Sequence, residues 1–267
     1  MDLGLAGARA IVTGGSKGMG RAIAETLAAD GASVAVFARG KAALDETVAR
    51  LKSLGAPEAL GIVADMADTQ SVEAAVATVG DQWRELNVLV HTTGPGAGYF
   101  EQMSDGEWEE AFSLGTLAAV RVVRAALPLL RSAEWARIVT LSAHSIQRQN
   151  PQIVAYTAAK AALTSVTKNL SKSLAPEGIL VNCVCPGTIV TASFTEGLSA
   201  ALAAEGLDAT DPVHVMTFIE KHYHQPADLG RAGLPDEIAS ITTYLASRRN
   251  GYVTGATVNV DGGSDFV

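Results

Sequence analysis

A tyrosine and a lysine four residues apart, Tyr156 and Lys160, form the pair in this sequence best suited to proton chemistry. They lie in the stretch 155–174, which predicts a helix, and residues four apart share one face of a helix. A lysine ammonium beside a tyrosine favours the phenolate and lowers the pKa of the phenol, so the tyrosine can donate and accept a proton near neutral pH. The pair alone is a weak signal, because this spacing is common on exposed helices.

A glycine-rich turn near the start of the chain strengthens that signal. A predicted strand, 8–13, and a predicted helix, 18–30, flank the sequence Thr13-Gly14-Gly15-Ser16-Lys17-Gly18-Met19-Gly20. In that context glycines allow a tight turn and a close approach of the backbone to a pyrophosphate, which sits on the helix N-terminus. A plain glycine-rich turn is the alternative. The pattern predicts a dinucleotide site with these cofactor-binding residues: Gly14, Ser16, Lys17, Gly18, Met19 and Gly20.

The end of the second predicted strand, 33–38, bears on the choice between NAD and NADP. NAD sites usually carry an Asp or Glu there, which holds the ribose 2′-hydroxyl. Here the strand leads into Arg39 without an acid. Arg39 and Lys17 offer two cations for a 2′-phosphate, although both are also compatible with ordinary surface bases. We therefore expect NADP(H) as the cofactor.

Apolar runs typical of strands alternate with helical patterns along the whole chain. The further predicted strands are 59–64, 88–92, 136–141, 180–185 and 256–260, and the further predicted helices are 41–55, 69–85, 104–132 and 235–246. This alternation predicts an α/β protein with a single-domain Rossmann fold over residues 1–267, a doubly wound parallel sheet with helices on both faces. The segment 188–231 has no strand signal, and we expect it to form a substrate lid.

Composition disfavours several classes of protein. The formal charge of −8 argues against nucleic acid and anionic membranes as partners. No apolar run reaches about 18 residues, and no signal pattern opens the chain, which predicts neither a membrane span nor secretion. Cys183 and Cys185 are typical of buried thiols in a reducing compartment, and we expect a cytoplasmic protein. His214, His222 and His224 lack a strong zinc spacing, so we expect no metal.

Taken together, these residues resemble the short-chain dehydrogenase/reductase family, and its ketoacyl reductase-like members in particular. The resemblance covers essentially the whole chain, through the glycine-rich turn, Asp65-Met66, Gly94, Tyr156 with Lys160, Asn182 with Pro186-Gly187, and Asp261-Gly262-Gly263. It implies that Tyr156 exchanges a proton with the substrate oxygen and that Lys160 binds the nicotinamide ribose. It further implies a homotetramer or homodimer, and cofactor contacts from Asp65, Met66, Thr92, Gly94, Pro186, Gly187 and Thr188.

The loop after the fourth strand departs from the family pattern, as does a position in the long fourth helix. The family sequence Asn-Asn-Ala-Gly is replaced by His91-Thr92-Thr93-Gly94, and we expect threonine hydrogen bonds to keep the loop in shape. The family's catalytic Asn, seven residues after Trp108, is Gly115. Gly115 either leaves space for a water, a bend or a substrate atom, or packs two helices together.

A third departure concerns the serine that orients the substrate in the family, thirteen residues before the tyrosine. That position is Ala143, with Ser142, His144 and Ser145 beside it. We take Ser142 and Ser145 as the catalytic candidates, with His144 as a further one and an ordinary loop role as the alternative.

These observations lead to one main functional expectation. We expect an NADP(H)-dependent oxidoreductase that interconverts a small-molecule carbonyl and a secondary alcohol, a ketoreductase with Tyr156 as proton donor and acceptor. The alternative is a dehydratase or lyase, or a weakly active cofactor-binding protein, on the same fold. Gly115 and Ala143 keep that alternative open, because they occupy two of the family's catalytic positions.

Overall fold

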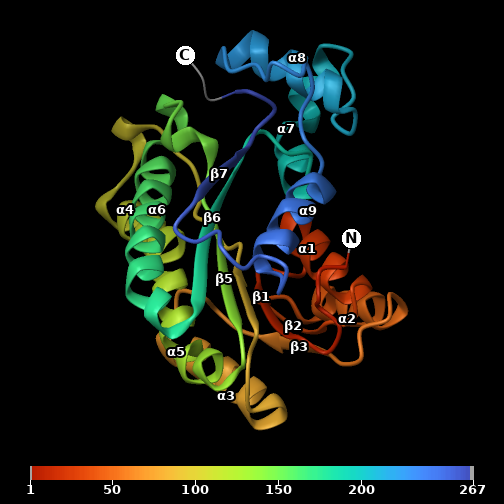
Figure 1. Ribbon diagram of the computed structural model, residues 1–267. Helices are drawn as coiled ribbons and strands as arrows, with labels where there is room; N and C mark the ends of the chain where they lie inside the picture. Colours follow the sequence, from red (N-terminus) through yellow and green to blue (C-terminus); the bar gives the residue numbers. More distant parts are fainter. Residues whose placement is uncertain (1, 265–267) are drawn as a thin grey trace.

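A seven-stranded parallel sheet forms the centre of the computed structural model, which describes residues 2–264 (Figure 1). The strand order is β3-β2-β1-β4-β5-β6-β7, so successive strands are added on one side of β1 up to β3 and on the other side from β4 onward. This is the doubly wound Rossmann arrangement that the alternating pattern predicted. The strands are β1 Arg9–Thr13, β2 Ser33–Ala38, β3 Ala59–Val63, β4 Val88–His91, β5 Ala136–Leu141, β6 Ile179–Pro186 and β7 Thr257–Val260.

Helices cover both faces of this sheet, as predicted (Figure 1). One face carries α1 (Gly18–Ala29), α2 (Lys41–Ser53) and α9 (Pro235–Ala246). The other face carries α3 (Thr69–Trp83), α5 (Ala118–Ser132) and α6 (Val154–Leu174). The predicted strand and helix ends agree with these bounds to within about two residues, which is the usual uncertainty of such boundaries.

The strands are continuous aliphatic runs because the sheet is buried on both faces. In β1 the side chain of Val12 packs with the α1 face, whereas that of Ile11 packs with the α3 face, and both are fully buried. In β6 the thiols of Cys183 and Cys185 are unbridged and 1% and 0% exposed, as expected from their apolar run.

The fourth helical run differs from the single helix predicted over 104–132. It begins at the Ser104 capping box as α4 (Asp105–Phe112), loosens into one π-helical turn (Ser113–Leu117), and continues as α5. The π turn has no distinctive hydrophobic period, so the pattern did not reveal it.

The same run, Asp105–Ser132, is long and apolar enough to span a membrane by length and composition. The sequence predicted no membrane span because polar residues interrupt every apolar run before about 18 residues. In this fold the run is a core helix, because Val122, Val123 and Ala126 are buried against the sheet.

Two helices, α7 (Ala192–Ala204) and α8 (Pro212–Tyr223), fill most of the segment 188–231. They lie beyond the carboxyl ends of β6 and β7 (Figure 1). A parallel bridge from Ile189 to Gly233 fastens the base of the segment. The two helices pack on each other through an apolar cluster of their own, made by Leu202, Val215, Met216, Phe218, Ile219, Ala227 and Ala232.

Candidate active site

The predicted cofactor residues gather at the carboxyl ends of β1, β2 and β4, where the strand order reverses. Ligands of open α/β sheets bind in the crevice at this position. A cavity of about 560 Å³ lies there. Of the predicted cofactor residues it is lined by Gly14, Ser16, Lys17, Gly18, Met19, Gly20, Arg39, Asp65, Met66, Thr92 and Gly94.

The glycine-rich turn is close-packed around its own backbone. Gly14 has a φ of +67°, and a Cβ there would lie 2.6 Å from Oγ1 of Thr92. A Cβ on Gly20 would collide with the carbonyl oxygen of Gly14. Thr92 donates its hydroxyl to the carbonyl oxygen of Thr13 over 2.6 Å, which ties the β4 loop to the turn as we expected of a threonine. The backbone is therefore bare where a pyrophosphate would approach.

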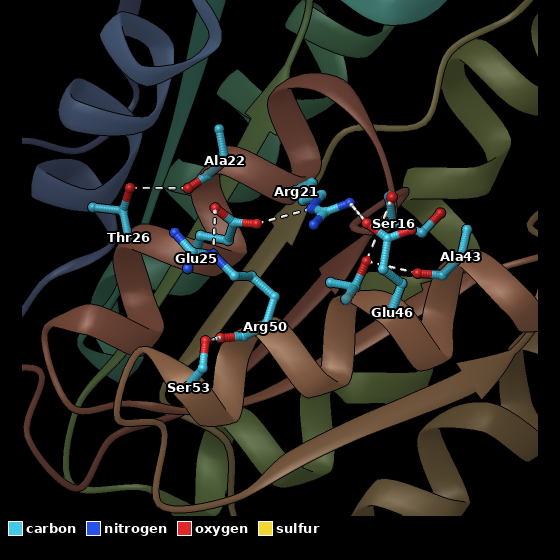
Figure 2. A network of polar contacts seen from close by, with 10 residues as sticks. Ser16, Arg21, Ala22, Glu25, Thr26, Ala43, Glu46, Arg50 and Ser53 are labelled. Atoms are coloured by element: carbon cyan, nitrogen blue, oxygen red, sulfur yellow. Dashed lines mark hydrogen bonds and ion pairs between the residues drawn. The ribbon is translucent and has the colours of Figure 1, made fainter.

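Lys17 and Arg39, which line this cavity, differ from the neighbouring Arg21 in what they bind. Arg21, in the first turns of α1, is held by Glu25 and by Glu46 of α2, each at 2.8 Å (Figure 2). The side chains of Lys17 and Arg39, by contrast, make no hydrogen bond or ion pair within residues 2–264. Two uncommitted cations thus line the cavity at its β2 end.

A second cavity, of about 340 Å³, adjoins the first at the carboxyl ends of β5 and β6. It lies between the β5–α6 loop and the start of α7. Its wall contains Tyr156, Ser142, Ala143, His144, Ser145, Pro186, Gly187, Thr188, Ile153, Ile189 and Phe194. The structure thus brings both serine candidates and the Pro186–Thr188 turn to one place with the tyrosine.

Lys160 is buried behind this second cavity, one helix turn from Tyr156. Its Nζ donates to the carbonyl oxygens of Leu141, at 2.7 Å, and Thr93, at 3.2 Å. A Cβ on Gly94 would lie 3.4 Å from Nζ, so the absence of a side chain at Gly94 lets the ammonium pack closely against the backbone there. Burial lowers the pKa of Lys160 to about 8, so the ammonium form is still populated near neutral pH.

Tyr156 differs from our expectation in its pKa. Its ring centroid lies 5.9 Å from the Lys160 ammonium, so the pair is close, as the spacing predicted. Burial nevertheless raises the pKa of Tyr156 to about 12, because the protein around the hydroxyl desolvates the phenolate, and Cys185 adds to this rise. The predicted lowering of this pKa is therefore not produced by the chain's own groups.

The two serine candidates are not equivalent in this geometry. Ser142 donates its hydroxyl to the carbonyl oxygen of Lys160 over 2.9 Å and accepts from Thr164, so its proton is already committed. Ser145 accepts a hydrogen bond from the Thr157 hydroxyl over 3.0 Å, which leaves its own proton available. Both side chains are almost fully buried.

His91 was noted in the sequence only as a departure from the family pattern, yet it is a distinctive feature of the site. It is fully buried at the end of β4, with Nδ1 2.9 Å from Oγ1 of Thr13 and Nε2 without a partner among the described residues. Burial first, and the charge of Lys160 second, lower its pKa to about 3. A neutral imidazole therefore lies at the end of β4, where the charge of Lys160 further disfavours its protonation. No sequence period marks such a position, because a strand end can be buried or exposed.

The histidines of the segment 188–231 do not converge. His222 pairs with Glu205 over 2.6 Å on the surface, and His214 accepts from the backbone of Asp208. No group of three His, Cys, Asp or Glu side chains that could hold a metal ion occurs within residues 2–264.

Comparison with known proteins agrees with the fold. A family model described as enoyl-(acyl carrier protein) reductase matches residues 14–265. Dehydrogenase/reductase SDR family member 4 of Caenorhabditis elegans is 32% identical over 95% of this chain and 94% of the worm protein. The 3-oxoacyl-[acyl-carrier-protein] reductase FabG of Aquifex aeolicus is 31% identical over 98% of this chain and 99% of its own. The chain belongs to the short-chain dehydrogenase/reductase family, and its ketoacyl reductase-like character is supported.

Solved structures extend the similarity to the whole molecule. The L-sorbose reductase of Gluconobacter frateurii, crystallised with NADPH and L-sorbose, superposes with a TM-score of 0.93 at 28% identity and 100% coverage of both chains. An actinorhodin polyketide ketoreductase solved with NADPH has a TM-score of 0.87, also at 28% identity.

Proposed function

We propose that this protein is an NADP(H)-dependent oxidoreductase that interconverts a carbonyl compound and a secondary alcohol. The observation that carries the proposal is the adjacency of two cavities. One has a bare glycine turn and free cations, and the other has Tyr156 and Ser145 on its wall with Lys160 behind. Such a pair of sites can hold a dinucleotide and a small carbonyl compound side by side.

Three features fit the chain to NADP(H). The turn around Gly14 and Gly20 leaves no room for side chains and exposes backbone, as a pyrophosphate requires. Within the part of the chain that the structure describes, Arg39 and Lys17 are unpaired and could bind a 2′-phosphate, whereas Arg21 is already neutralised. NADPH is bound by several similar enzymes of known structure, the L-sorbose reductase among them.

The chain's own residues supply the proton and the orientation of the substrate. A bound nicotinamide supplies or accepts the hydride. Tyr156 Oη donates a proton to the carbonyl oxygen, or removes it from the alcohol, as general acid and base. Ser145 donates its free proton to the same oxygen and so polarises the carbonyl. Lys160, fixed by two carbonyl oxygens, holds a positive charge close to the tyrosine ring.

The burial of Tyr156 has a chemical consequence for this scheme. A phenol with a raised pKa stays protonated at neutral pH, so the free protein holds the proton that carbonyl reduction consumes, but this phenol is also a weaker acid than free tyrosine. Reaction in the direction of alcohol oxidation needs additional positive charge near the phenol, and bound NADP⁺ carries such a charge.

Three further parts of the proposal rest on the same site. The segment 188–231 is the substrate lid, because Phe194 and Ile189 form one wall of the cavity around Tyr156. The chain acts as one catalytic domain, and it assembles as a homodimer or homotetramer in the cytoplasm, by analogy with its family.

The test is the oxidation of NADPH, and the reduction of NADP⁺, with a panel of ketones, ketoses including L-sorbose, ketoacyl thioesters and secondary alcohols. Tyr156→Phe serves as the matched variant, because it removes one hydroxyl and keeps the ring. We expect turnover with the parent chain, and its loss in the variant with NADPH binding retained. Turnover that survives in Tyr156→Phe would contradict the mechanism. Tight NADPH binding without net oxidation would favour the dehydratase or lyase alternative.

A further inference from the structure

The loop between β5 and α6 carries an arginine to which neither the motifs nor the family resemblance drew attention. Arg148 follows the 3-10 turn His144–Ile146, and its backbone N–H donates to the carbonyl oxygen of His144 over 3.2 Å. It therefore lies directly behind the turn that places His144 and Ser145 in the wall of the Tyr156 cavity.

The guanidinium of Arg148 binds backbone carbonyl oxygens from two distant segments and no carboxylate within the described chain. It donates to His224 over 2.9 Å and to Pro226 over 3.3 Å, at the exit of α8, and to Ser264 over 2.7 Å. Hydrogen bonds from an ionised donor are stronger than neutral ones, and the planar guanidinium has the fork of donors needed for several acceptors. One side chain thus joins the substrate loop, the lid exit and the final described residues.

Neighbouring contacts support the same junction. Gln225 donates to the carbonyl oxygen of Gln149 over 3.1 Å, and Asn259 donates to the side chain of Gln147 over 2.6 Å. The lid exit also lies against the tail, because Leu229 donates its backbone N–H to the carbonyl oxygen of Gly262 over 3.1 Å. These bonds are single and mostly exposed, whereas Arg148 contributes three charged ones.

Lid and loop both contribute to the wall of the cavity in front of Tyr156. Phe194 belongs to α7 on the lid, and Ser145 belongs to the loop. α7 and α8 share one apolar cluster, so holding the exit of α8 also holds α7. We propose that Arg148 is a positioning residue that clamps the lid against the substrate loop and so sets the distance between the two. The catalytic part of this inference rests on the proposed function, whereas the clamp itself does not.

The experiment compares Arg148→Met, which keeps length and apolar bulk but loses every donor, with Arg148→Lys, which keeps the charge. Arg131→Met is the matched control, because the guanidinium of Arg131 also donates two hydrogen bonds, both to Glu177 at the surface and away from both cavities. A 1 Å misplacement remote from the chemistry can cost on the order of 100-fold, so we expect kcat/KM of Arg148→Met to fall by about 10- to 100-fold. The fall should come mainly from a higher KM for the carbonyl compound. The Kd for NADPH should stay unchanged, and Arg148→Lys should be intermediate.

A second readout needs no substrate. Trypsin cuts after Lys221, an exposed residue in the last turn of α8, only when that turn unfolds locally. Arg148 opposes this unfolding because it binds the carbonyl oxygens of His224 and Pro226, which directly follow the helix. Cleavage there, followed by mass spectrometry, should accelerate in Arg148→Met by about tenfold for each 1.4 kcal/mol that the clamp contributes, and not in Arg131→Met.

Two outcomes would overturn the proposal. In the first, KM and the cleavage rate both match those of the parent chain. In the second, kcat, KM, NADPH binding and thermal stability deteriorate together, as after general damage to the fold. If the parent chain reduces none of the carbonyl compounds, the proposed function fails, and the trypsin measurement alone decides the clamp.

Discussion

Gly115 lies directly against Ala159, so that a Cβ added to the glycine would be 2.6 Å from the Cβ of the alanine. The contact joins the π turn to α6, one residue before Lys160. Thr116 reinforces it by donating its hydroxyl to the carbonyl oxygen of Ala159 over 2.8 Å. Of the two interpretations of Gly115 that the sequence left open, this close approach favours the packing glycine.

Restoring the family's asparagine at position 115 should therefore damage the protein. Overpacking typically costs roughly 1–3 kcal/mol, so we expect Gly115→Asn to lower the Tm by several degrees without raising kcat. Gly106→Asn in α4 is the control, because no atom lies within 4 Å of a Cβ there. A Gly115→Asn protein that is as stable as its parent and more active would show that the position lacks only the amide.

Ser145, rather than Ser142, should orient the substrate. Ser145→Ala removes the hydroxyl whose proton is free, and loss of one such donor costs on the order of 100-fold in kcat. Ser142→Ala removes a bond to the α6 backbone and should mainly cost stability, by about 1 kcal/mol. Steady-state kinetics and urea unfolding of both variants separate the two roles. The reverse ranking in kcat would contradict this assignment.

Arg39 should determine the preference for NADPH. A hydrogen bond to a charged group contributes about 1.5–3 kcal/mol, so Arg39→Ala should weaken NADPH binding by about 10- to 100-fold and leave NADH binding unchanged. Lys41→Ala is a suitable control, because Lys41 is a cation at the start of α2, two residues after Arg39, and already pairs with Asp45. Direct titration by nucleotide fluorescence measures both cofactors. Equal binding of NADH and NADPH by the parent chain would contradict the prediction.

His91 should make the protein sensitive to acid. The pKa of His91 is lowered to about 3 in the folded chain, whereas an unperturbed histidine has a pKa near 6.5. Between pH 3 and pH 6.5 the unfolded state therefore binds more protons than the folded state. Stability therefore falls as the pH drops below about 6.5, by about 2 kcal/mol at pH 5. His91→Asn should lose this component. Urea unfolding of both proteins at pH 7, 6 and 5 measures it, and parallel pH profiles would contradict it.

Much of the fold could be predicted from the sequence because its signals are local. Buried parallel strands are uninterrupted aliphatic runs, and the Gly14 turn is a contiguous motif between a strand and a helix. The Tyr156 and Lys160 spacing placed both side chains correctly, since a helix repeats from one residue to the next. Arg39 and Asp65 directly follow the predicted strands, so their position at the carboxyl ends of the parallel strands could also be predicted.

What the sequence did not reveal depends on contacts between remote segments. The acceptors of Arg148 lie 76 or more residues away along the chain, and no spacing rule links them. The pKa of Tyr156 follows from how completely the fold buries the hydroxyl, which the spacing to Lys160 does not reveal. Phe194 lines the Tyr156 cavity, whereas Met216 and Phe218 pack within the lid, and no sequence period distinguishes these two roles.

α7 and α8 share an apolar cluster that is separate from the two clusters on the sheet, and this separation affects how the lid can move. Its large side chains, among them Met216 and Phe218, are shielded by one another rather than by the sheet. A segment that buries its own side chains can swing away as one body without exposing them to water. Its amide protons in α8 and those in β1 should therefore belong to different cooperative units of hydrogen exchange, with β1 protected up to the global unfolding free energy.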